Sequence, residues 1–250
     1  ALTNATSSDA LTLTVTGTAA ATDLTALDGK TSVNVGATAV TTITGTQAQV
    51  VAINVGTITT SGNYAVTLSG ISSASDVNTI VNDTTGIVTA TVTEATAASL
   101  NSALANASST DALTLTLTDT ALASADDLIA LDGKTSVTVN AGSVTSVTDT
   151  YADINTLYGL SGISGLGNEA VTISDTTSAA NVNGILSKTS GVVTATVSSD
   201  TASNLNTALT NATSSDALTL TVTGSATATD LNSLDGKTSV NVIVNATSVT

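Results

Sequence analysis

The sequence predicts a repeat solenoid in which right-handed coils of about 25 residues set parallel β-strands side by side and join them by short helical segments. Three observations lead to this β/α solenoid. Long blocks of sequence recur, stretches that alternate apolar residues with threonine recur within each block, and the intervening stretches carry apolar residues three or four positions apart. A strand, a short helix and another strand, repeated in this order, favour a right-handed crossover and a parallel sheet.

The long repeat is visible in two motifs. The octapeptide at residues 9–16 recurs almost unchanged at 111–118 and 216–223, and the Leu-Asp-Gly-Lys-Thr-Ser-Val motif at 27–33 recurs at 131–137 and 234–240. We therefore expect one continuous solenoid over residues 1–250. It would hold about two and a half copies of the repeat, at approximately 1–103, 104–208 and 209–250.

Each long repeat contains several predicted strands. Those of the first repeat start near Ala10, Val40, Ala65 and Ile87, and the next repeat starts at Ala112. Within them apolar side chains alternate with threonine, which is typical of a strand with one buried and one exposed face. A second short strand is expected once in each long repeat, at 32–35, 136–139 and 239–242.

The stretches between these strands are predicted to be helices of about two turns. Apolar pairs there have helical spacing, as in Leu24 with Leu27 and Leu100 with Leu104. An aspartate such as Asp23 precedes most pairs, where its carboxylate can cap free N–H groups. The Asp-Gly turns at 28–29, 132–133 and 235–236 would end the helix at a glycine with positive φ. The structural alternative is a pure parallel β-helix, with the helical stretches flattened into a further sheet.

Neither end of the sequence has the features of a capping repeat. Residues 2–35 nearly repeat as 209–242, and neither copy is more polar or changes its period. We expect a solenoid that is uncapped at both ends. It would belong to a longer polypeptide or stack head to tail into a filament.

The composition excludes several classes of function. The chain has no Cys, His, Met, Pro, Trp or Phe, which removes disulfides, thiolate or imidazole metal sites and histidine catalysis. A net charge of −15 with four basic residues disfavours nucleic-acid binding. No apolar run approaches the roughly 18 residues of a membrane span. We expect no enzymatic activity, since the sparse lysines lie mostly in repeated turns.

Two glycine motifs resemble nucleotide-binding loops without meeting their requirements. The Asp-Gly-Lys-Thr turn at 28–31 has Leu24 where a phosphate-binding loop needs its first glycine. The Gly-Leu-Gly-Asn-Glu-Ala stretch at 165–170 runs into a predicted strand, whereas a dinucleotide-binding motif opens a helix. Both are interpreted as turns, and no cofactor is predicted from them.

The regular exposed feature is a face of threonines on the predicted sheet, which resembles the ice-binding face of Thr-x-Thr antifreeze solenoids. An adhesin stalk or an ice-binding solenoid using this face is therefore the alternative function, and surface glycans are a further candidate partner. The threonines assigned to the face are Thr12, Thr14, Thr16, Thr89, Thr91, Thr93, Thr114, Thr116, Thr118, Thr219, Thr221 and Thr223.

Calcium is the one cofactor that the residue types suit. Of the 19 acids 17 are aspartate, and oxygen ligands in turns suit a hard cation. Asp126, Asp127 and Asp132 could gather around an ion locally, although helix caps and turns explain them without one. The glycine- and aspartate-rich nonapeptides of calcium-binding β-rolls are absent from the sequence.

The repeats also resemble those of very large secreted cyanobacterial cell-surface proteins, often labelled haemolysin-type calcium-binding. The matching units are Asp-Leu-x-x-Leu-Asp-Gly-Lys-Thr-Ser-Val at 23–33, 127–137 and 230–240, with Val-Thr-x-Ile-Thr-Gly-Thr at 40–46. The resemblance implies secretion and a cell-surface or fibre-forming role, and it carries no catalytic residues. The leading hypothesis is a structural protein of an extracellular fibre, sheath or surface layer that associates with itself.

Overall fold

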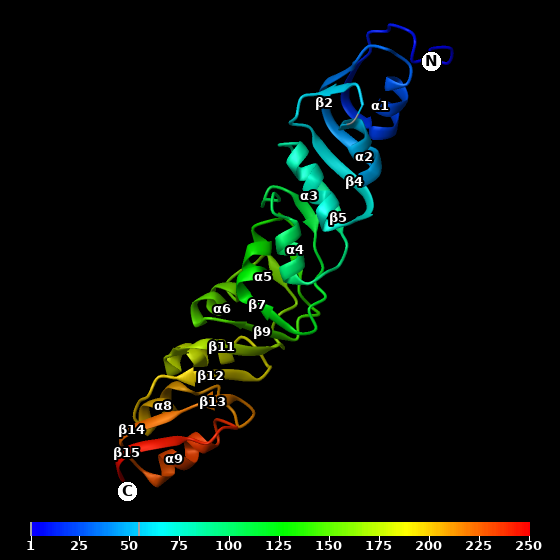
Figure 1. Ribbon diagram of the computed structural model, residues 1–250. Helices are drawn as coiled ribbons and strands as arrows, with labels where there is room; N and C mark the ends of the chain where they lie inside the picture. Colours follow the sequence, from blue (N-terminus) through cyan, green and yellow to red (C-terminus); the bar gives the residue numbers. More distant parts are fainter. Residues whose placement is uncertain (1, 55) are drawn as a thin grey trace. The chain divides into compact units, whose positions relative to one another are not determined.

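The chain is an α/β protein with parallel strands, seen in a computed structural model that describes residues 2–54 and 56–250 (Figure 1). It divides into two compact units. The first unit consists of Ala1–Ala95, Ser99–Thr116 and Leu131–Val139. The second unit consists of Thr96–Ala98, Leu117–Ala130 and Asn140–Thr250.

The strands of the first unit form one sheet. Its order is β1-β2-β4-β5-β6, with β3 beside β2, so most neighbours in space are also neighbours in sequence. Every strand pair in this sheet is parallel. The strands are β1 (Thr14–Ala20), β2 (Val35–Gly45), β3 (Ile58–Thr60), β4 (Ala65–Ser72), β5 (Val88–Val92) and β6 (Ala112–Thr114).

The second unit repeats this plan. A sheet of order β13-β12-β11-β9-β7 and two smaller pairs, β10-β8 and β14-β15, account for its strands. These are β7 (Leu122–Ser124), β8 (Val139–Asn140, which begins in the first unit), β9 (Ser146–Asp149), β10 (Ile163–Ser164), β11 (Ala170–Thr177), β12 (Val193–Val197), β13 (Ala217–Thr219), β14 (Thr221–Ala226) and β15 (Ile243–Val249).

Short helices connect many of the strands, as Figure 1 shows, whereas among the described residues no helix separates β3 from β4, β6 from β7, β8 from β9, β10 from β11 or β13 from β14. The predicted helices are thus present, and the alternative of a pure β-helix, with these stretches flattened into a sheet, is wrong. They are α1 (Ala21–Asp28), α2 (Gln47–Asn54), α3 (Ala74–Asp83), α4 (Ala97–Ala103), α5 (Ala125–Asp132), α6 (Tyr151–Leu157), α7 (Ala179–Leu186), α8 (Ala202–Ala208) and α9 (Ala228–Asp235).

The core lies between each sheet and its helices and is built from aliphatic side chains. In the first unit, Leu24 of α1 and Ile80 of α3 are buried together with Ile43 of β2. In the second unit, Ile154 of α6 and Ile185 of α7 are buried in the same way. Each helix is too short to be stable alone, so burial of its apolar face against the sheet holds it in place.

The helix ends differ from the prediction in two details. Ser73 and Thr150, not the aspartates, are N-caps, and their hydroxyl oxygens accept the N–H groups of Asp76 and Asp153. The hydroxyl in turn donates its proton to the carboxylate of the aspartate three residues on. At the other end, Gly29 has φ −69°, so the Asp-Gly turn closes without the positive φ that was expected.

The expected second short strands at 32–35, 136–139 and 239–242 are also wrong. Among the described residues, these stretches belong to a set of five turns, each built on a buried threonine that precedes a strand. Only Val35 and Val139 of the expected stretches begin a strand. We call these turns the threonine turns; their central residues are Thr31, Thr84, Thr135, Thr189 and Thr238.

Each threonine turn is bonded to the loop that precedes it by about 20 to 25 residues. The Thr135 hydroxyl donates to the Leu113 carbonyl at 2.7 Å and accepts the N–H groups of Leu113 and Val137. The next residue, Ser136, donates its N–H to the Asp111 carbonyl at 2.7 Å. The bond from the hydroxyl to the loop carbonyl and the bond from the next N–H recur at the other four turns, and the N–H of the acceptor loop is also accepted at Thr31 and Thr238. We call the accepting loops, at 9–11, 62–64, 111–113, 167–169 and 216–218, the acceptor loops.

Two threonine turns approach their acceptor loops so closely that only glycine fits. A Cβ atom on Gly86 would collide with the carbonyl of Tyr64, and one on Gly191 with the carbonyl of Glu169. The other three turns carry Val33, Val137 and Val240 at this position and keep the same threonine–carbonyl bond. Threonine turns and acceptor loops alternate along the chain, and each turn bonds the approach to one strand (β2, β5, β8, β12 or β15) to an acceptor loop.

The Thr135→Val variant should lower the free energy of unfolding by about 1–3 kcal/mol, because two buried N–H groups and one carbonyl lose their partner. The urea midpoint at constant slope would measure this. Thr114→Val is the matched control, since Thr114 is exposed on β6 and its loss should change stability by less than about 0.5 kcal/mol. Equal shifts for both variants would contradict a stabilising role for the threonine turn.

Candidate functional site

Threonines form short rows on the sheets, and most of the threonines assigned from the sequence lie outside these rows. Register places Thr44, Thr67 and Thr89 side by side on β2, β4 and β5, and the row then meets Ala112 of β6. In the second unit, Thr148, Thr172 and Thr194 form an equivalent row that meets Ala217. Strand pairing, which the sequence does not display, identifies these rows. Of their members, only Thr89 was among the threonines assigned from the sequence.

The assigned threonines differ in exposure. Thr12, Thr14, Thr16, Thr89, Thr91, Thr93, Thr114 and Thr118 are exposed, whereas Thr116, Thr219, Thr221 and Thr223 are half-buried. Irregular pairing interrupts the rows. The register shifts between Thr67 and Ile71 in β4, and between Thr172 and Thr176 in β11. The threonine face is therefore a set of rows three residues wide and not a continuous lattice.

The predicted calcium ligands are only partly brought together. Asp126 belongs to a group with Asp149 and Asp153 whose carboxylate oxygens lie within 4.8 Å of one another. Asp127 follows Asp126 in the first turn of α5 and Asp132 is the last residue of that helix, and neither belongs to the group. Asp149 and Asp153 were missed because Asp149 ends the neighbouring strand β9 and Asp153 lies in the helix after it, and only the pairing of β7 with β9 brings them to Asp126.

Two carboxylates of this acidic cluster accept hydrogen bonds from nearby groups of the protein. Asp149 accepts the Ser124 hydroxyl at 2.9 Å and the N–H groups of Asp126 and Thr150. Asp153 accepts the Thr150 hydroxyl. Calcium takes about six to eight oxygen ligands, and the cluster offers three side chains. Helix capping accounts for these contacts without a cation.

The cluster raises the pKa of Asp126 from its ordinary value of 3.8. The negative charge of Asp149 is the main cause, followed by that of Asp153, a small contribution from burial and the charge of Asp127. The charged form of Asp126 is therefore disfavoured in the folded protein.

At two other places, an aspartate that comes about 22–24 residues later in the chain caps the start of a helix. Asp119 accepts the N–H of Ala97 at the start of α4 at 2.8 Å, and Asp175 accepts the N–H of Tyr151 at the start of α6 at 2.7 Å. A carboxylate at a helix N-terminus satisfies a free donor and complements the helix dipole. Much of the acidity of the chain thus lies at helix starts.

The lysines complement the opposite helix ends. The Lys134 ammonium donates to the carbonyl of Leu104 at 3.0 Å, just past α4, and Lys237 donates to that of Leu209 at 2.7 Å, just past α8. A cation here satisfies a terminal carbonyl and complements the helix dipole. The Asp-Gly-Lys-Thr motif thus supplies a lysine that joins neighbouring helices and a threonine that forms the next turn.

Glu169 is the most deeply buried carboxylate among the described residues, ahead of Asp111, Asp216 and Asp119. Glu169 is fully buried and occupies the position in its acceptor loop that Leu113 and Leu218 occupy in theirs. Its carboxylate accepts the Tyr158 hydroxyl and the N–H groups of Gly167 and Asn168, at 2.6 and 3.1 Å. Burial and the bond to Glu169 raise the pKa of Tyr158 far above its ordinary value of 10.0.

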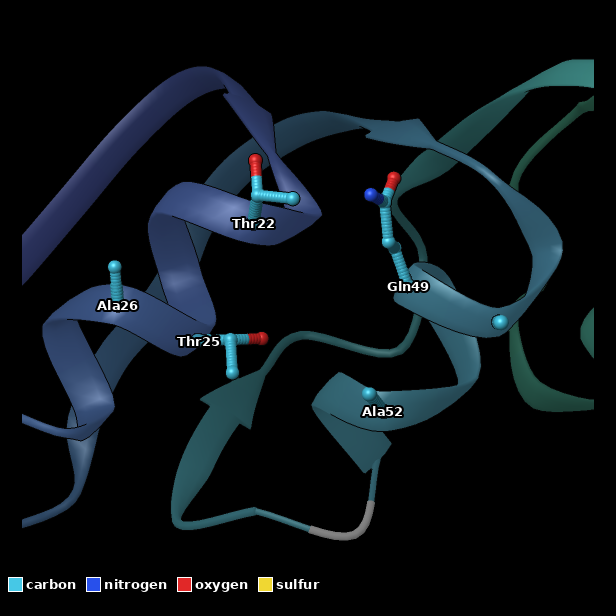
Figure 2. Close-up of a pocket in the computed structure, with 6 residues that line it drawn as sticks. Thr22, Thr25, Ala26, Gln49 and Ala52 are labelled. Carbon is cyan, nitrogen blue, oxygen red and sulfur yellow. The ribbon is translucent and has the colours of Figure 1, made fainter.

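The surface has several hollows, and they include grooves between neighbouring helices. Figure 2 shows one of them, where Thr22, Thr25 and Ala26 of α1 face Gln49 and Ala52 of α2 across a shared gap. Its lining contains no acid, base or nucleophile other than hydroxyl groups. This groove offers no arrangement for acid–base or nucleophilic catalysis.

Comparison of the chain with protein-family models, curated proteins and solved structures finds no match. Within the described residues, no helix has the length and apolar character required to span a bilayer.

Tyr158→Phe should lower the free energy of unfolding by about 1–3 kcal/mol at neutral pH, because the buried Glu169 carboxylate loses a donor. The raised pKa of Tyr158 means that its contribution is full below pH 10 and is lost as pH rises through the folded-state pKa. The difference between wild type and variant should therefore shrink above pH 10 in urea titrations. Tyr151→Phe is the control. Identical pH profiles for the two variants would refute the role of the Glu169–Tyr158 pair.

Asp126→Asn should raise the thermal midpoint slightly at neutral pH, because it removes one of three clustered negative charges. The sign follows from the raised pKa: the folded state binds the Asp126 proton more tightly, so ionisation costs stability as pH rises above about 4. The gain should vanish below that pH. Glu94→Gln, at an exposed acid outside the cluster, should show a smaller effect in the same melts. A lower midpoint for Asp126→Asn would contradict this account.

Proposed function

We propose that the chain is a β/α solenoid with a structural, non-catalytic role, and that it builds an extracellular fibre, sheath or surface layer by end-to-end continuation or stacking. The observation that carries this proposal is the alternation of threonine turns and acceptor loops. At each of five places along the chain the same polar contacts tie one strand to the preceding one. Such nearest-neighbour joints are what a repeat array requires.

The use of the polar side chains supports the same conclusion. Asp119, Asp149 and Asp175 cap helices, and Lys134 and Lys237 join neighbouring helices. The buried Glu169 carboxylate accepts hydrogen bonds from the Tyr158 hydroxyl and from two backbone N–H groups. These contacts are local and structural, and none of them leaves a reactive group in a closed pocket.

The composition suits a durable extracellular polymer. The chain has no oxidisable sulfur, and a net charge of −15 keeps neighbouring polymers apart in solution. The extracellular setting follows from the resemblance of its repeats to those of large secreted surface proteins. The alternative of an adhesin stalk or ice-binding solenoid is less well supported, because the threonine rows end after three strands at Ala112 and Ala217.

Electron microscopy of native material, prepared without chelator, tests this proposal. We expect long filaments with an axial repeat of about 19 Å, four strand spacings for each long repeat. A parallel sample treated with chelator should keep the same repeat, because the Asp149 and Asp153 carboxylates are bonded to donors of the protein itself. Discrete short rods at all concentrations would overturn the structural proposal and favour a ligand-binding rod.

A further inference from the structure

Asn183 is the one asparagine in the sequence that a glycine follows. It is half-buried in the middle of α7, and the exposed Gly184 comes next. An asparagine side chain loses its amide most readily before glycine, because glycine has no Cβ to hinder attack by its backbone nitrogen and few limits on its dihedral angles. The dipeptide is therefore a candidate site of deamidation.

The fold gives no steric reason for the glycine at this place. A Cβ atom added at Gly184 would have no neighbour within 4 Å, and its backbone φ is not positive. Glycine inside a helix is less stable than alanine, because it loses more conformational freedom on folding. The equivalent residue of α3 in the first unit is Thr79, so the repeat accepts a side chain here.

The Asn183 side chain joins α7 to the segment that follows α8. Its Oδ1 accepts the N–H of Asn211 at 2.7 Å, and its Nδ2 donates to the Thr210 hydroxyl at 3.1 Å. In the first unit, Asn78 Oδ1 accepts the N–H of Asn106 at 2.8 Å in the same way. The two asparagines thus make the same joint and differ in the residue that follows each of them.

The helix holds the dipeptide in a geometry that prevents the reaction. An imide ring closes only if the Gly184 nitrogen reaches the Asn183 Cγ, and a helical ψ of about −42° keeps these atoms apart. That nitrogen is also held, since an interior helical N–H donates to the carbonyl four residues earlier. The Asn183 carbonyl accepts the N–H of Ser187 at 3.2 Å. The reaction therefore requires that α7 opens first.

We propose that Asn183 is a deamidation site gated by the opening of α7, and that the reaction makes this opening irreversible. In the open chain the Gly184 nitrogen attacks the Asn183 Cγ, the Cγ–Nδ2 bond breaks, and the amide leaves as ammonia with the proton of the attacking nitrogen. Water then opens the imide at either carbonyl, which gives aspartate or isoaspartate.

Both products weaken the joint between α7 and the segment after α8. Aspartate keeps an acceptor for the Asn211 N–H but loses the donor to the Thr210 hydroxyl. Isoaspartate adds a carbon to the main chain and breaks the regular spacing that α7 needs to form again. Local opening of one segment is an ordinary event in a repeat array, and here it would leave a permanent mark. This inference does not depend on the proposed structural role.

Peptide mapping by mass spectrometry tests the site in the purified chain, incubated at mildly alkaline pH with and without guanidinium chloride. In denaturant, Asn183 should deamidate about tenfold faster than Asn78 or more, because the branched Thr79 hinders the attack that Gly184 allows. Without denaturant, the Asn183 rate should fall by about tenfold or more, in proportion to the open fraction of α7. Equal rates at the two asparagines in denaturant would overturn the assignment of the site, and an Asn183 rate that ignores denaturant would overturn the gate.

Two variants separate the chemistry from the gate. Gly184→Ala adds a side chain in open space, so the variant should fold and deamidate about tenfold more slowly in denaturant. Ser178→Ala removes the N-cap of α7, whose hydroxyl oxygen accepts the Asn181 N–H at 3.2 Å. It should raise the folded-state rate about fivefold and leave the rate in denaturant unchanged.

The matched control is Ser73→Ala, which removes the equivalent N-cap of α3 in the first unit. It should leave the Asn183 rate at the wild-type value, because α7 keeps its own cap. Circular dichroism should show that all three variants are folded. A folded-state rate for Ser178→Ala equal to that of Ser73→Ala would overturn α7 as the gate.

Discussion

The buried hydroxyl of the threonine turn is the interaction on which the arrangement of strands depends. At Thr135 one oxygen accepts two backbone N–H groups and donates its proton to a carbonyl, so three polar groups are satisfied at a buried corner. Valine has the same shape and none of this capacity. Because the contact recurs at each threonine turn, the position of one strand fixes the start of the next.

The thin core follows from the same geometry. Short helices lie close to the strands that they join, and aliphatic residues such as Leu24 and Ile154 fill the space without phenylalanine, methionine or tryptophan. Glu169 is the exception, because a carboxylate replaces the leucine found at Leu113 and Leu218. Tyr158 and two backbone N–H groups satisfy it locally. The repeat thus tolerates a buried charge where nearby donors compensate its desolvation.

Charge in this protein is arranged by helix polarity. Acidic side chains such as Asp119 and Asp175 lie at helix N-termini, and Lys134 and Lys237 contact the carbonyls just past helix C-termini. Four aspartates are exceptions, because each is the last residue of its helix: Asp28, Asp83, Asp132 and Asp235. The acidic cluster at Asp126, Asp149 and Asp153 forms where two such starts approach each other, and mutual repulsion there raises the pKa of Asp126.

The sequence by itself determined the alternation of strands and short helices, because periods of two and of three to four residues depend only on local geometry. It also indicated Asp126 as a member of an acidic group. Tertiary structure decided which residues meet across neighbouring segments: Asp149 and Asp153 beside Asp126, and Thr135 beside Leu113. It also decided that the Ala-Leu-Thr tripeptide is a strand at 112–114 and not at 10–12. Strand pairing between residues about 23 positions apart makes these choices, and no local pattern records its register.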